Sequence, residues 1–185
     1  MRNTSKTGRT LCEGAICVAM AMVLSFFEAS FWAQGGSIDL VMVPLILFAV
    51  RWGCGWGVGA GLMFGTLKYF VGAGWAIDWV SIIFDYSVAY AMVGLAGLFK
   101  RKDKQIWLAA IVGGVARFII HYISGFTVYA RYMPEEFMGM SMTSPFIYSA
   151  LYNGGYMLPS TILAVVVCMT LAKPMQSFLR GDDLR

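Results

Sequence analysis

The sequence predicts an all-α integral membrane protein, and two observations carry that prediction: its composition and the length of its apolar runs. Of the 185 residues, 59% are hydrophobic and only 13% are charged. Water-soluble domains carry roughly 45–50% apolar and about 25% charged residues. A soluble globule could not cover so much apolar surface. A bilayer can, because its hydrocarbon core of roughly 30 Å accepts apolar helices of about 20 residues.

Six apolar runs predict six transmembrane helices in a single domain that covers residues 1–185. The predicted helices lie at about residues 11–28, 38–50, 55–71, 77–99, 106–125 and 145–172. The first run follows basic residues, as a secretory signal would, but it is long for a signal core and lacks a small-residue cleavage site. We therefore interpret it as a spanning helix. Because six helices nearly exhaust the chain, no room remains for an ATPase domain.

The basic residues predict the orientation of these helices. Eleven of the lysines and arginines fall in the two terminal tails and in the second and fourth gaps between helices, whereas the other gaps hold only Arg131. Cytoplasmic segments of membrane proteins carry such an excess of lysine and arginine. We expect both termini to be cytoplasmic in a multi-pass protein of the cell membrane. The net charge of +4 follows this topology and does not indicate nucleic-acid binding.

A glycine repeat occurs in the third predicted helix. Gly53, Gly57, Gly61 and Gly65 follow one another at four-residue spacing, so they line one face of a helix. Such a bare stripe lets another membrane helix approach closely. The segment matches neither dinucleotide nor P-loop glycine patterns, so we interpret the stripe as a packing surface.

The sequence offers little for catalysis or metal binding. No cysteine pair has C-x-x-C spacing, so Cys12, Cys17, Cys54 and Cys168 are expected to be free thiols. No H-E-x-x-H pattern occurs, and no serine or cysteine nucleophile stands out as a partner for His121 and Asp85. No repeated carbonyl or charged motif suggests a channel filter. We expect neither an enzyme nor a cofactor held by this chain.

Polar residues inside the predicted spans are the functional candidates, because the bilayer makes such groups costly. They are Lys68, Asp85, His121 and Asn153. At about 1.5 Å per helical residue, Asp85 and Asn153 lie roughly 12 Å, and His121 roughly 6 Å, below the outer surface. Lys68 lies near the outer end of its helix, where its long stem could reach the interface. The tyrosines of the same layer are Tyr86, Tyr122, Tyr129 and Tyr148.

This polar layer suits a small, flat, cationic heterocycle. A carboxylate accepts hydrogen bonds from an amino-substituted ring, and aromatic faces attract a cation. The sequence gives no sign of a basic cluster for a phosphate group. Three alternatives remain open: Asp85 pairs with Lys68 or Arg117 to hold the bundle, His121 bridges two helices, and the tyrosines form an interfacial belt.

Several segments carry a resemblance to a known family. They are Gln34-Gly35-Gly36-Ser37 with Pro44 and Arg51-Trp52-Gly53, then Asp85-Tyr86, then Arg117 to Gly125 around His121, then Tyr148 to Asn153. Across almost the whole chain, from Ala15 to Pro159, the sequence resembles the thiamine-specific S-component of energy-coupling-factor (ECF) vitamin transporters. That resemblance implies a six-helix subunit that captures extracellular thiamine with high affinity.

The resemblance also implies roles for individual residues. Asp85, with Tyr86 beside it, would meet the aminopyrimidine; glutamate also occurs there in the family, and the shorter aspartate would shift the contact. Tyr129 would cover the thiazolium where a tryptophan can serve, and indole is the better cation–π partner. The remaining implied pocket residues are His121, Gly125 through its backbone, Tyr148, Asn153 and, as a cap from the first loop, Trp32.

Partners follow from the same resemblance. S-components dock on a membrane coupling subunit that carries two cytoplasmic ATPases, so ATP would be hydrolysed by partner subunits. The docking pattern A-x-x-x-A is matched by Ala15 and Ala19, although small residues at this spacing also serve ordinary helix packing. Two other functions remain open: an S-component for riboflavin or a thiamine precursor, and a structural membrane subunit whose polar residues only bridge helices.

Overall fold

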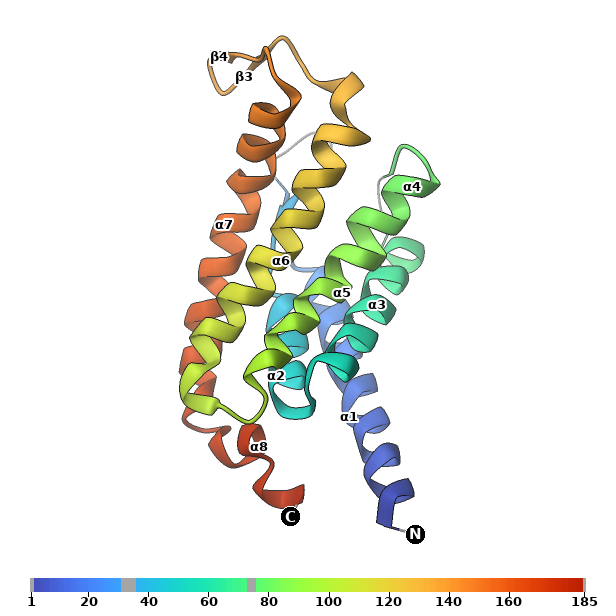
Figure 1. Cartoon of the computed structure of the whole chain (residues 1–185), viewed down its shortest axis with the longest axis vertical. Helices are drawn as coiled ribbons and strands as arrows, with labels where there is room; N and C mark the ends of the chain where they lie inside the picture. The colour runs from blue at the N-terminus through green and yellow to red at the C-terminus, as the bar shows by residue number, and fades with distance from the viewer. Residues whose placement is uncertain (1, 31–35, 73–75, 185) are drawn as a thin grey trace.

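The computed structural model describes residues 2–30, 36–72 and 76–184, and it is a bundle of long helices (Figure 1). Its main helices are α1 (Arg2–Ser25), α2 (Met42–Trp52), α3 (Cys54–Val71), a composite helix over Trp79–Phe99, α6 (Ile106–Thr127) and α7 (Pro145–Ala172). In the described part of the chain, four helices are long and apolar enough to cross a membrane: Lys6–Ser25, Trp79–Phe99, Asp103–Thr127 and Pro145–Ala172.

The short helix α2 forms the centre of the bundle. All of its residues from Met42 to Trp52 are buried, and α1, α3, α6 and α7 contact it. Helix α2 begins at Met42, whereas the sequence predicted a helix that begins at about residue 38. Pro44 therefore falls in the first turn, where a missing backbone N–H costs no helical hydrogen bond.

Two short β-hairpins correct the prediction of a purely helical chain. In the first loop, Ala29–Ser30 (β1) pairs antiparallel with Ser37–Ile38 (β2). In the loop between α6 and α7, Glu136–Phe137 (β3) pairs with Met140–Ser141 (β4). Strands of two residues have no periodicity that a sequence pattern could reveal.

The composite helix over Trp79–Phe99 changes its winding along its length. It consists of α4 (Trp79–Ser81), a π-helical segment (Ile82–Val88), α5 (Ala89–Val93) and a 3-10 segment (Gly94–Phe99). Asp78 caps its start through a capping box with Ser81. π-Helical turns are rare and occur frequently at functional sites. This one contains Asp85.

The glycine stripe packs against this composite helix, as predicted. A Cβ on Gly61 would collide with the carbonyl oxygen of Tyr90, and one on Gly65 with that of Tyr86. Helix α3 therefore lies backbone to backbone against the composite helix. The stripe fixes the position of the π-helical segment.

The C-terminal segment folds back onto the bundle at the end where both chain termini lie (Figure 1). The sequence suggested only a polar tail. Instead, α8 (Gln176–Arg180) and a 3-10 turn (Asp182–Leu184) surround the fully buried Arg51. Arg51 binds Glu13 at 2.6 Å and Asp183 at 2.9 Å, and its guanidinium lies 4.0 Å from the ring centroid of Phe178. This cluster ties α1, α2 and the C-terminal segment together.

The close approach of α3 to the composite helix generates a stability prediction. We expect Gly61→Ala to lower the free energy of unfolding by about 1–3 kcal/mol, because the added methyl forces the two backbones apart. Thermal unfolding of the detergent-solubilised protein measures this effect. Gly59→Ala on the same helix is the matched control, since a Cβ there meets nothing within 4 Å. Equal melting temperatures for the two variants would contradict the packing argument.

The Arg51 cluster generates a prediction on acid stability. Hydrogen bonds from Arg51 lower the pKa of Asp183 from 3.8 to about 2. Because the folded-state pKa lies below the ordinary one, this stabilisation is complete above pH 3.8 and is lost as the pH falls toward 2.

We therefore expect Asp183→Asn to lower the melting temperature at neutral pH and to leave it close to that of the unmodified protein near pH 2. Asp182→Asn removes the same charge from the neighbouring residue and serves as the control. A difference between Asp183→Asn and the unmodified protein that did not shrink with falling pH would exclude this role for the Asp183 carboxylate.

Candidate functional site

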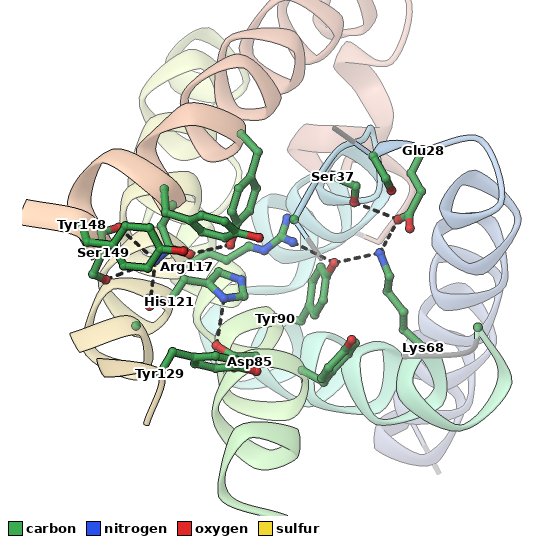
Figure 2. Close-up of a pocket in the computed structure, with 18 residues that line it drawn as sticks. Glu28, Ser37, Lys68, Asp85, Tyr90, Arg117, His121, Tyr129, Tyr148 and Ser149 are labelled. Atoms are coloured by element: carbon green, nitrogen blue, oxygen red, sulfur yellow. Dashed lines mark hydrogen bonds and ion pairs between the residues drawn. The ribbon is translucent and has the colours of Figure 1, made fainter. Parts of the chain in front are cut away.

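A cavity of about 240 Å³ lies among the helices (Figure 2). Its walls come from the C-terminal parts of α3 and α6, the N-terminal part of α7, the π-helical segment and the first loop. The residues predicted for the site that line it are Asp85, Tyr86, His121, Gly125, Tyr129, Tyr148 and Asn153. Trp32 lies outside the described residues. The structure thus brings seven positions from three separate stretches of sequence around one cavity.

Asp85 and His121 form the polar pair at one side of the cavity. His121 Nδ1 lies 3.1 Å from Asp85 Oδ1, and Ser124 Oγ donates to Asp85 Oδ2 at 2.9 Å. Because an ionised carboxylate only accepts, Nδ1 carries the shared hydrogen, and Nε2 of a neutral ring is then an acceptor. Nε2 has no hydrogen-bond partner among the described residues, although it is buried.

Asn153 lines the cavity, but both polar atoms of its side-chain amide form hydrogen bonds with other protein groups. Nδ2 donates to the carbonyl oxygens of His121 at 3.2 Å and Ser149 at 3.0 Å, and Oδ1 accepts from Tyr156 at 2.7 Å. Asn153 therefore positions the His121 backbone. Gly125 makes this contact possible, because a Cβ there would overlap Ser149 Oγ.

Aromatic side chains form another part of the wall. Tyr148 makes an edge contact with Phe137, with ring centroids 5.3 Å apart, and lies 5.6 Å from the Tyr152 ring. Tyr129 follows the end of α6, and burial raises the pKa of its hydroxyl, so that the side chain stays neutral. Phe137 belongs to the second hairpin. That hairpin therefore supports the aromatic wall from the loop between α6 and α7.

The opposite side of the cavity holds a charged cluster that the sequence analysis did not predict (Figure 2). Lys68 binds Glu28 at 2.7 Å, and Ser37 donates to the same carboxylate at 2.9 Å. Lys68 and Arg117 both donate to the Tyr90 hydroxyl, at 3.3 and 2.8 Å. The cluster joins the first loop to α3, α5 and α6.

This cluster corrects two expectations. Lys68 does not extend to the outer surface, because it is buried and paired with Glu28. The cavity is also lined by two cations, Lys68 and Arg117, although no cluster of basic residues was expected. The alternative that Asp85 pairs with one of these cations is wrong, since Asp85 binds His121 and Ser124.

The sequence contained a signal for the charged cluster around Lys68 and Arg117. Lysine and arginine within apolar helices require partners. The acidic residues that flank the first loop, Glu28 and Asp39, are those partners: Asp39 lies 3.8 Å from Lys68 and 3.9 Å from Arg117.

An apolar helix bundle around a cavity lined by polar and aromatic side chains defines a multi-pass membrane protein that binds a small molecule. Comparison with known proteins specifies the family. Residues 11–179 match the family model described as thiamine transporter protein (Thia_YuaJ). The chain belongs to the thiamine transporter family.

Individual relatives agree with this assignment. The chain is 32% identical to the thiamine transporter ThiT of Bacillus subtilis, over 97% of this chain and 98% of that protein. It is 28% identical to ThiT of Lacticaseibacillus paracasei, over 85% and 83% of the two chains. The solved structure of ThiT from Listeria monocytogenes superimposes with a TM-score of 0.83, at 26% identity, covering 94% of this chain and 98% of that one.

The contacts of Asn153 generate a prediction for this wall of the cavity. Asn153→Ala leaves the buried Tyr156 hydroxyl and the His121 carbonyl without this partner, so we expect the free energy of unfolding to fall by about 1–3 kcal/mol. Thermal unfolding measures the change. Thr170→Ala on the same helix is the control, since its exposed hydroxyl bonds only locally to Val166. A loss no larger than that of the control would contradict a positioning role for Asn153.

Proposed function

We propose that this chain captures extracellular thiamine as the substrate-binding subunit of an ATP-driven ECF importer. The observation that carries the proposal is the Asp85–His121 pair, which faces an aromatic-walled cavity in a chain of the thiamine transporter family. Asp85 supplies negative charge, and the His121 ring, which lines the cavity, holds Asp85 in place. Thiamine offers an aminopyrimidine and a cationic thiazolium to such a pocket. The chain is a transport protein and not an enzyme.

Each wall of the cavity has a proposed role. Asp85 and His121 bind the aminopyrimidine, with Tyr86 beside them. Tyr129 and Tyr148 present aromatic surface to the thiazolium cation. The further proposed site residues are Gly125, which permits close approach of α7, Asn153, which positions His121, and Trp32, which caps the pocket from the first loop.

The proposed topology has six membrane crossings in one domain, with both termini in the cytoplasm. Among the described residues, four helices have the length and hydropathy of a span, and α2 and α3 would supply the two shorter crossings. The distribution of lysine and arginine supports this orientation. In it, the cavity opens to the outside and the Arg51 cluster lies on the cytoplasmic side.

The proposed energy source is a partner complex of a membrane coupling subunit and two ATPases. One face of α1 supports this proposal, because Ala15 and Ala19 are exposed on it. The large apolar side chains exposed on the same helix are Leu11, Ile16, Met20 and Val23. Small residues among apolar ones allow another membrane helix to pack closely. Lipid or the coupling subunit would cover this surface.

Thiamine titration of purified variants tests the proposal. The unmodified protein should show saturable quenching of its six tryptophans by free thiamine and no such response to riboflavin. Asp85→Ala should weaken thiamine binding roughly 10- to 100-fold, because a hydrogen bond to a charged group contributes about 1.5–3 kcal/mol.

Glu135→Ala, on the exposed loop between α6 and α7, is the control and should bind as the unmodified protein does. Unchanged affinity in Asp85→Ala would refute the role given to Asp85. The absence of both quenching and thermal stabilisation with thiamine would refute thiamine capture.

A further inference from the structure

The cavity has two chemically different sides, and the proposed thiamine site uses the Asp85–His121 side for recognition. The other side holds the ion pair of Lys68 with Glu28, linked through the Tyr90 hydroxyl to Arg117 (Figure 2). Thiamine carries a hydroxyethyl group at the end of the molecule remote from its aminopyrimidine. Asp85 and Lys68 line the same cavity, so a thiamine held at Asp85 by its aminopyrimidine has its remote hydroxyl available to the Lys68 side. Phosphate esters of thiamine carry their phosphate on this same oxygen.

The Glu28 carboxylate is held in place by two donors. Oε2 of Glu28 accepts from Lys68 Nζ at 2.7 Å and from Ser37 Oγ at 2.9 Å. The Lys68 side chain is 11% exposed and that of Glu28 is 30% exposed, so bulk water screens this pair only partly. The pair thus neutralises a cation that would otherwise face the cavity.

The charges around the cavity match a ligand with one positive charge. Glu28 and Asp85 line the cavity, and Asp39 lies behind Lys68 and Arg117, at 3.8 and 3.9 Å. Three carboxylates therefore oppose two cations, and with His121 neutral one negative charge remains. Free thiamine carries one positive charge on its thiazolium ring. A phosphate ester adds about 1.5–2 negative charges at neutral pH, so the charges no longer match.

Arg117 does not present a free cation to a ligand in the cavity. Its Nη2 donates to the Tyr90 hydroxyl at 2.8 Å, and its guanidinium lies 4.1 Å from the centroid of the Tyr90 ring. Its Nε and Nη1 are buried within the protein. Lys68, whose side chain is 11% exposed, is therefore the more accessible of the two cations.

We propose that the Glu28–Lys68 ion pair is a specificity determinant that makes this cavity select free thiamine over thiamine phosphate esters. The inference rests on the proposed function, because it concerns the same cavity. Glu28 occupies the Lys68 ammonium group, which could otherwise bind a phosphate. It also repels the phosphate by its own charge.

The test compares the dissociation constants of thiamine and thiamine monophosphate, measured by calorimetric titration of the purified full-length protein. Glu28→Gln keeps a hydrogen-bond acceptor for Lys68 and Ser37 but removes the charge. It should shift the ratio of the two constants toward the phosphate ester by about tenfold or more, since like-charge repulsion at a binding site is costly. Lys68→Met leaves Glu28 unpaired and should shift the ratio the other way.

A double variant of Glu28→Gln and Lys68→Met restores the net charge of the cavity and should return the ratio close to its original value. Glu136→Gln is the matched control, because it removes one carboxylate from the exposed second hairpin; its ratio should not change.

The outcomes separate this inference from the proposed function. If the unmodified protein binds neither ligand, the proposed function fails and this inference fails with it. If it binds thiamine but Glu28→Gln leaves the ratio unchanged, only the selection by Glu28 is overturned. A double variant that keeps the ratio of Glu28→Gln overturns it as well, because Lys68 is then not the cation that accepts phosphate. If Glu28→Gln does not fold, the opposite shift expected for Lys68→Met tests the inference independently.

Discussion

Every charge buried in this bundle has to be paired, because an isolated ion in an apolar interior costs several kcal/mol. That constraint organises the structure at both ends. At the end where the chain termini lie, Arg51 forms ion pairs with Glu13 and Asp183, and these pairs hold the C-terminal segment against the bundle. At the cavity, Lys68 forms an ion pair with Glu28 of the first loop. Each pairing links segments that are far apart in the sequence.

The glycine stripe of α3 complements these pairings. It lets α3 contact the backbone of the composite helix directly, and a side chain at Gly61 or Gly65 would prevent that approach. The same contact sets the depth of the π-helical segment and hence of Asp85. A packing feature with no chemistry of its own thus positions the carboxylate that the proposed site depends on.

The cavity combines rigid and loop-borne parts. His121 and Asn153 lie on α6 and α7, which run side by side over most of their lengths (Figure 1). Both acidic and hydroxyl partners come from the first loop: Glu28 directly precedes β1, and Ser37 is the first residue of β2. Recognition by the helical residues is therefore set by helix packing, whereas the charged side depends on how the loop is held. The Lys68–Glu28 pair is the contact that joins the two.

The sequence by itself determined the membrane class, most of the helical segments, the packing role of the glycines and the presence of polar groups such as Asp85 and His121 in apolar runs. Those features depend on residues that are close together in the sequence, so composition and residue spacing are enough to predict them. The tertiary structure alone decided which charges pair. Lys68 and Glu28 are 40 residues apart, and Arg51 and Asp183 are 132 residues apart. Such pairing depends on how helices pack, and no pattern along the chain records that packing.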